Sequence, residues 1–117
     1  FISLKQVFPV MTAWPSMPVL ALIKPQFEVG KIEADRGSGV IRDPHLHIQV
    51  LEDIIEYAME LGYQLHGLVH SQKPGPKGNI EYFIYLVPSE ASQVSSRDDL
   101  KTKVENAVTL ARMELLN

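Results

Sequence analysis

A lysine and a glutamate lie at the ends of two segments that are expected to be strands. Lys24 directly follows the apolar run 19–23, and Glu81 lies at the start of the aromatic and β-branched run 80–87. A lysine amine acts as a general base only when burial or neighbouring cations lower its pKa. A carboxylate beside it favours the charged amine, so its better role is to orient that amine. Because the spacing also fits an ordinary ion pair at the strand ends, both interpretations stay open at this point.

Four basic side chains are candidates for binding the phosphate groups of a nucleic acid. They are Arg36, Arg42, Lys73 and Lys77. The two arginines lie in a segment rich in charge and glycine, and the two lysines in a turn-like segment rich in proline and glycine. These cations could neutralise backbone phosphates, although a solvated loop explains the same residues equally well.

Asp43, His45 and His47 are side chains of the types that hold metal ions. Side chains two positions apart on a helix point in very different directions, so the two histidines cannot both face one ion. We therefore expect no metal site, and we interpret Asp43 as a helix cap and the histidines as surface residues.

Length and composition limit the classes of function. The chain has 117 residues, 45% of them hydrophobic and 21% charged, as in one soluble globular domain. It contains no cysteine, so disulfides and thiolate metal sites are excluded. Its net charge of −3 argues against nucleic-acid binding over the whole surface but allows a local basic face. The apolar runs are far shorter than the roughly 20 residues of a membrane span, so we expect a cytoplasmic protein without a membrane partner.

The apolar patterns predict the elements that position these residues. A short helix is expected over 3–13, and the unbroken apolar run 19–23 is typical of a strand covered on both faces. Residues 24–42 are expected to form a long loop. A helix is expected over 44–61, because an Asp-Pro pair marks its start and a glycine follows its last residue.

The second half of the chain is expected to form a hairpin. Residues 63–71 predict a strand with Leu65, Gly67 and Val69 on one face, and 80–87 predict a second strand. The proline and glycine residues between them are typical of a turn. A polar linker and an amphipathic helix complete the chain.

This order of elements predicts an α/β fold, the second half of a doubly wound sheet closed by an antiparallel hairpin strand. Ligands of such sheets bind beyond the carboxyl ends of the parallel strands, where Lys24 lies. If 80–87 pairs between the other two strands, Lys24 and Glu81 become neighbours. We therefore predict that their charged groups lie within a few ångströms of hydrogen-bonding distance.

Four short motifs, in this order, resemble those of a known family. They are FISL at 1–4, ALIKPQFE at 21–28, VIRDP at 40–44 and GPKGNIE at 75–81. Each is similar to a motif of TlyA-type (hemolysin A) proteins, which belong to the FtsJ-like class of S-adenosylmethionine-dependent methyltransferases. The resemblance covers residues 1 to about 87 and identifies the fold as the C-terminal half of a Rossmann-like methyltransferase sheet.

The resemblance implies 2′-O-methylation of cytidine ribose in ribosomal RNA, with S-adenosylmethionine as the cofactor and no metal. The class uses a lysine, an aspartate, a second lysine and a glutamate, and Lys24 and Glu81 match the last two. The other two residues and the main cofactor-binding loop would precede Phe1, so the cofactor-binding residues of this chain are unknown. We therefore expect a C-terminal part of a longer protein that is inactive by itself.

The resemblance also implies partners and an organisation for the chain. Ribosomal RNA or a ribosomal subunit would be the partner, contacted by the four basic residues named above. A homo-oligomer is expected on another ground, since the strand edge at which the missing half of the sheet would pair is open to a second copy. The expected parts are the C-terminal half of the methyltransferase domain, a linker and a C-terminal amphipathic helix, at 1–87, 88–96 and 97–117.

Two other classes of function are considered beside the enzyme. One is a non-catalytic RNA-binding or assembly module on the same fold. The other is a membrane-lytic hemolysin, for which the last helix lacks a basic polar face and a bulky aromatic wedge, so we discount it.

Overall fold

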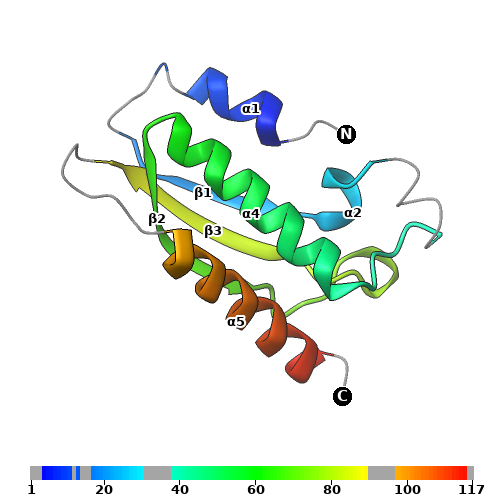
Figure 1. The fold of residues 1–117 in the computed structure, drawn as a ribbon. Coiled ribbons are helices and arrows are strands. Elements are labelled where there is room, and N and C mark those ends of the chain that lie inside the picture. Colours follow the sequence, from blue (N-terminus) through cyan, green and yellow to red (C-terminus); the bar gives the residue numbers. More distant parts are fainter. Residues whose placement is uncertain (1–3, 12, 14–16, 31–37, 90–96, 116–117) are drawn as a thin grey trace.

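The computed structural model describes residues 4–11, 13, 17–30, 38–89 and 97–115. In chain order the elements are α1 (Leu4–Met11), β1 (Val19–Ile23), α2 (Pro25–Glu28), α4 (Pro44–Glu60), β2 (Tyr63–His70), the 3-10 turn η1 (Pro76–Gly78), β3 (Tyr82–Pro88) and α5 (Arg97–Leu115). Figure 1 shows the long helices α4 and α5 lying across a small sheet.

Three strands form the sheet, in the order β1-β3-β2. β3 runs antiparallel to both of its neighbours, so β1 and β2 run in the same direction. Residues 80–87 therefore lie between the other two strands, as the prediction for Lys24 and Glu81 requires, and the predicted β2–β3 hairpin is confirmed. The fold is α/β, as expected.

Helices α4 and α5 cover one face of the sheet, and α1 packs beside α4 (Figure 1). The apolar side of α4 places Leu51, Ile54 and Ile55 in a core with almost no exposure. Burial of each such side chain stabilises the fold by roughly 1.5–3 kcal/mol. Val104 and Val108 of α5 belong to the same core. Among the described helices, none is long and apolar enough to cross a membrane.

The two ends of α4 follow the sequence prediction closely. The Asp43 carboxylate accepts a hydrogen bond from the backbone N–H of His45 at 2.9 Å, and Pro44 occupies the first helical position. The start of a helix leaves backbone N–H groups unpaired. The Asp43 carboxylate pairs one of them, and Pro44 has no N–H group to pair. Gly62 takes a φ of 96°, which an L side chain rarely adopts, and thereby ends the helix.

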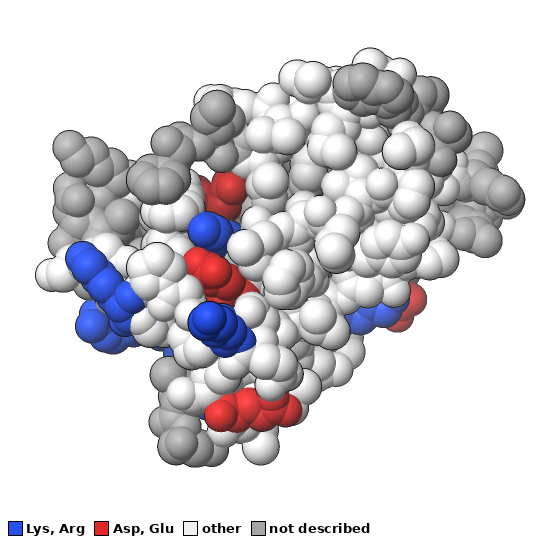
Figure 2. Space-filling model, turned by 180° about the vertical axis from the view of Figure 1, so that it is seen from behind, with Lys and Arg blue, Asp and Glu red and all other residues white. Residues whose placement is uncertain are grey.

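The other face of the sheet is open. On it, Leu20, Val69 and Tyr85 are 70%, 59% and 43% exposed. The prediction that the 19–23 strand is covered on both faces is therefore wrong for Leu20, because α4 and α5 both lie on the opposite side. Figure 2 shows this side of the molecule, where a broad uncharged surface borders a group of Lys, Arg, Asp and Glu side chains at one end.

A bulge in β2 changes which of its side chains face the helices. The pairing with β3 shifts register between Leu65 and Gly67, which adds one residue to β2. Leu65 consequently faces the core at 8% exposure, whereas Val69 lies on the open face. The prediction that Leu65, Gly67 and Val69 share one face is wrong, because strict alternation stops at the bulge.

The first helix is shorter than predicted and is tied to α2. It ends at Met11, and the proposed capping residue Ser3 lies outside the described residues. The backbone N–H of Leu4 donates to Glu28 Oε1 at 3.0 Å, so a carboxylate from α2 occupies the start of α1.

Candidate active site

The pairing of β1 with β3 brings Lys24 and Glu81 to the same end of the sheet. Ile23 pairs with Tyr82 in the β1–β3 ladder, and the two candidate residues lie one position beyond each partner. Ile23 and Tyr82 face the helices and are fully buried, so alternation along the chain directs Lys24 and Glu81 toward the other side.

The two charged groups do not bond to each other in the structure. The Glu81 carboxylate accepts a hydrogen bond from Gln26, and the Lys24 ammonium lies 5.4 Å from the centroid of the Phe27 ring. The two residues lie directly beyond the paired ends of β1 and β3, and no hydrogen bond joins them. The predicted short distance between their charged groups stays a prediction. Glu81 is only 6% exposed.

Gln26 reaches Glu81 because the chain turns sharply after β1. Lys24 has the extended conformation favoured before proline, and Pro25 then starts the single-turn helix α2. The expectation of an unbroken loop over 24–42 is therefore wrong at its start. Gln26 Nε2 donates to Glu81 Oε2 at 2.8 Å, and both side chains are buried. The sequence analysis did not identify Gln26, whose partner lies 55 residues away.

Gly75 leaves the space that the Glu81 carboxylate occupies. A Cβ atom at Gly75 would lie 2.5 Å from Glu81 Cδ, which is far inside van der Waals contact. The Gly75 backbone N–H donates to Asn79 O at 2.8 Å and closes the turn. Only glycine fits this close approach between the turn and the carboxylate.

Asn79 joins the turn to the segment that precedes α4. Its side chain is 2% exposed, and its Oδ1 accepts from the backbone N–H of Ile41 at 3.0 Å. Its Nδ2 donates to Gly39 O at 2.8 Å and to Pro76 O at 3.0 Å. One buried amide thus fixes two loops against each other, because its hydrogen bonds replace those with water.

His47 fixes the same segment from the helix side. Its Nε2 lies 2.8 Å from Ile41 O and its Nδ1 lies 2.9 Å from the Tyr82 hydroxyl. A carbonyl oxygen only accepts, so Nε2 carries the proton and Nδ1 accepts from Tyr82. Burial lowers the pKa of His47, and the hydrogen bond to Ile41 opposes this only in part. Burial also raises the pKa of Tyr82.

The prediction of surface histidines is right for His45 and wrong for His47. His45 is exposed, and His47 is 1% exposed within the apolar stripe of α4. The spacing of His47 to Val50, Leu51 and Ile54 is the signal that could have identified its burial. Among the described residues, no group of three His, Asp or Glu side chains is arranged to hold a metal ion.

The predicted RNA-binding residues separate into three cases. Arg36 lies outside the described residues. Lys73 is exposed in the turn after β2. Lys77 and Arg42 lie together at a pocket of about 390 Å³ that also includes Arg112 of α5.

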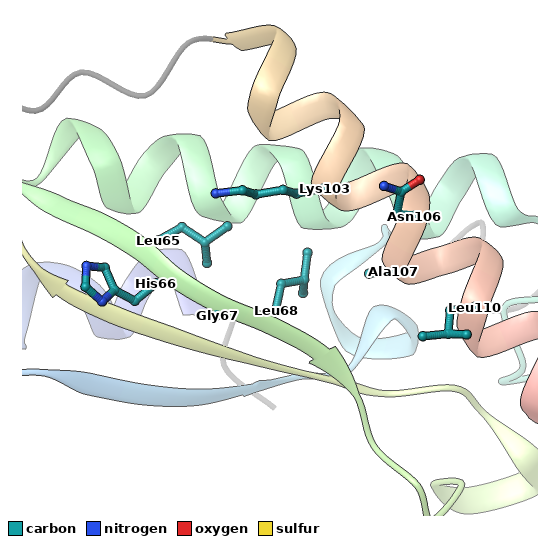
Figure 3. Close-up of a pocket in the computed structure, with 8 residues that line it drawn as sticks. All are labelled: Leu65, His66, Gly67, Leu68, Lys103, Asn106, Ala107 and Leu110. Atoms are coloured by element: carbon teal, nitrogen blue, oxygen red, sulfur yellow. The ribbon is translucent and has the colours of Figure 1, made fainter.

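Another pocket, of about 350 Å³, lies between β2 and α5 (Figure 3). Leu65 and Leu68 of β2 face Ala107 and Leu110 of α5 across it, with Lys103 and Asn106 at its rim. None of the candidate site residues lines it, so its size alone does not connect it with the chemistry proposed from the sequence.

Comparison with known proteins agrees with the fold and the motifs. The model of the FtsJ-like methyltransferase family matches residues 1–87. The 16S/23S rRNA (cytidine-2′-O)-methyltransferase TlyA of Mycobacterium tuberculosis is 37% identical over 111 residues, which are 93% of this chain and 41% of that protein. Hemolysin A of Brachyspira hyodysenteriae is 31% identical over 94 residues, which cover 74% of this chain and 37% of that protein.

A solved structure extends this similarity to three dimensions. A protein from Streptococcus thermophilus, described as a suspected hemolysin, matches with a TM-score of 0.83 at 32% identity, over 97% of this chain and 40% of that chain. The chain thus spans about two-fifths of the length of the relatives it matches. By its match over residues 1–87 and by these relatives, the chain belongs to the FtsJ-like methyltransferase family, within the group of TlyA and hemolysin A proteins.

Proposed function

We propose that the protein to which this chain belongs is an S-adenosylmethionine-dependent 2′-O-methyltransferase of ribosomal RNA, with Lys24 acting on the acceptor ribose and Glu81 positioning Lys24. The observation that supports this best is the buried Glu81 carboxylate beside Lys24, held by Gln26 at 2.8 Å. The relative from Mycobacterium tuberculosis carries the same activity in its name. A ribosomal RNA substrate also places the protein in the cytoplasm.

In this mechanism Lys24 would take the proton of the ribose 2′-hydroxyl, or polarise that hydroxyl, and so make its oxygen more nucleophilic. Glu81 is a positioning residue that draws the Lys24 amine away from Phe27 and toward the acceptor oxygen. Gln26 fixes the carboxylate for that task. Its other amide atom, Oε1, is buried without a hydrogen-bond partner among the described residues.

S-adenosylmethionine would supply an electrophilic methyl group on a sulfonium sulfur. Within the described residues, no glycine-rich loop connects a strand to the start of a helix, the arrangement that usually cradles such cofactors. β1 continues into Pro25 and β2 into the hairpin turn. These residues alone therefore do not form the cofactor site, and their part in the reaction is on the acceptor side.

We further infer that the three strands are the C-terminal half of a larger Rossmann-like sheet. The open face with Leu20 and Val69 supports this, because sheets of that class carry helices on both faces. By the same reasoning the 117 residues alone should be inactive and should bind no S-adenosylmethionine. Isothermal titration calorimetry of the 117-residue chain tests this, and micromolar binding would contradict it.

The assignment of Lys24 is tested in the full-length protein. Lys24→Ala should abolish methyl transfer to ribosomal RNA while cofactor affinity stays nearly unchanged, because Lys24 acts on the acceptor. Lys101→Ala, which removes an exposed lysine of α5, is the matched control. Transfer of a labelled methyl group is the measurement. A Lys24→Ala protein that keeps most of its turnover number rejects the assignment.

A second candidate is a non-catalytic RNA-binding module. It is favoured by the absence of a bond between Lys24 and Glu81, since Lys24 instead lies over Phe27. The same assay separates the two candidates. A full-length protein that binds ribosomal RNA and cofactor but transfers no methyl group supports the module.

A further inference from the structure

The C-terminal helix contributes a cation to a pocket near the turn. The family model ends at residue 87, before α5 begins. Arg112 of α5 nevertheless donates from Nη1 to Arg42 O at 2.9 Å, across 70 residues of chain. With Lys77 and Arg42 it lines the pocket of about 390 Å³, here called the Arg112 pocket, whose apolar part is Val40, Ile41 and Ile80.

The cations of the Arg112 pocket are held in place by neutral partners. Lys77 Nζ donates to Ser38 O at 3.0 Å, and Arg112 donates to the Arg42 carbonyl. These bonds leave two of three donors on Lys77 and most of the five on Arg112 available. In the described part of the chain, no ion pair of Lys77 or Arg112 is found. Two positive charges without an ion-pair partner among the described residues therefore line one pocket.

The walls of the Arg112 pocket are fixed before any ligand arrives. Asn79 holds the backbone of Gly39 and Ile41, and His47 holds the Ile41 carbonyl. A site whose loops are already ordered loses less conformational entropy on binding. A basic rim over an apolar floor suits a ligand with an anionic group joined to a less polar one, such as a nucleotide unit.

We propose that the Arg112 pocket binds a phosphate group of the RNA backbone, with Arg112 and Lys77 as its main donors. This proposal rests on the proposed function and gives the C-terminal helix a part in it.

Ile80 lines the pocket and Glu81 follows it, and neighbouring residues of extended chain point to opposite sides. The pocket and the Glu81 carboxylate thus lie on opposite sides of the hairpin turn. An RNA strand with its acceptor ribose at Lys24, beside Glu81, would cross the turn to reach the pocket. Such a contact positions the RNA without reading its sequence.

The experiment measures binding of a labelled single-stranded RNA oligonucleotide to the full-length protein across a series of salt concentrations. Arg112→Gln should lower the affinity roughly tenfold, as for a lost charge-assisted hydrogen bond. It should also reduce the slope of log affinity against log salt by about 0.7, the value for one phosphate of a single strand. Lys103→Gln, an exposed lysine of the same helix at the separate pocket in Figure 3, should change neither quantity.

Arg112→Lys separates phosphate binding from support of the loop. Lysine keeps the charge but not the geometry of the bond to Arg42 O, so this variant should retain the salt slope. Loss of affinity in both Arg112 variants with an unchanged slope would overturn the proposal in favour of a purely structural role. Normal RNA binding by Arg112→Gln would overturn it while the proposed function stands. A wild-type protein that binds no RNA at any salt concentration would overturn both.

Discussion

The two faces of the sheet differ in how their side chains are held. On the face under α4 and α5, Ile23, Ile84 and Leu86 have no exposure, and the polar pair His47 and Tyr82 is fully hydrogen-bonded. On the open face, Leu20 remains 70% exposed. Glu81 projects toward the open side yet is as buried as a core residue, because α2 and the hairpin turn enclose it. The side chains of the covered face therefore stabilise the fold, whereas α2 and the hairpin turn position the candidate site residue Glu81.

The largest expected effect is on stability and separates the two faces directly. Leu51→Ala should lower the free energy of unfolding by about 2–5 kcal/mol, because it opens a cavity in a core position with no exposure. Leu20→Ala makes the same chemical change on the open face and should cost well under about 1 kcal/mol. Urea denaturation of the 117-residue chain carrying each change is the measurement, and equal losses would mean that the open face of this chain is covered in solution.

A change at Gly75 should damage activity more than stability. Gly75→Ala forces the Glu81 carboxylate to move, and a displacement of about 1 Å at a catalytic group can lower the rate roughly a hundredfold. Gly67→Ala is the control, because its Cβ would meet only Tyr85 Cβ at an ordinary 3.6 Å. Methyl transfer by the full-length protein and its melting temperature should be recorded together. Full activity in Gly75→Ala would show that the position of Glu81 is unimportant.

Removal of the Gln26 amide should have a smaller effect on the same carboxylate. Gln26→Leu leaves Glu81 in place but without its donor, so kcat should fall roughly tenfold with KM unchanged. Gln49→Leu, at an exposed position of α4, should leave kcat as it is. A rise in KM alone would mean that Gln26 contacts substrate and does not position Glu81.

The smallest expected effect is on the pH dependence of stability, and it comes from His47 on the covered face. The pKa of His47 is lower in the folded chain than its ordinary 6.5, so the unfolded chain binds the extra proton first as pH falls. The contribution of neutral His47 to stability is therefore complete above about pH 6.5 and decreases below it, by at most about 1.4 kcal/mol per pH unit. His47→Gln should remove this part of the slope, whereas His45→Gln should keep it. Identical slopes in the wild type and His47→Gln would contradict the buried neutral state.

Sequence patterns predicted the features that depend on local chemistry or on topology. The bounds of α4 follow from Asp43 and Gly62, which act on their own neighbours. The hairpin and the directions of the strands were predicted, whereas the place of 80–87 between the other two strands was a condition that the observed order meets.

Other features depend on contacts between distant residues and could not be obtained in this way. The bond from Gln26 to Glu81 spans 55 residues, and the clash that makes Gly75 necessary is with a side chain from the next strand. The bulge in β2 likewise follows from how its residues pack against β3. The amide network of Asn79 belongs to the same group, since its partners are carbonyls of another loop.

The bulge between Leu65 and Gly67 also bears on how the chain behaves at high concentration. β2 is an edge strand of the sheet that the described residues form, and a straight edge strand offers a row of unpaired N–H and C=O groups to any strand of another molecule. The extra residue at the bulge breaks the regular spacing of that row and increases the local twist. A foreign strand could pair with only a few residues on either side. This edge is therefore protected against fibrous aggregation by a single irregularity in its backbone.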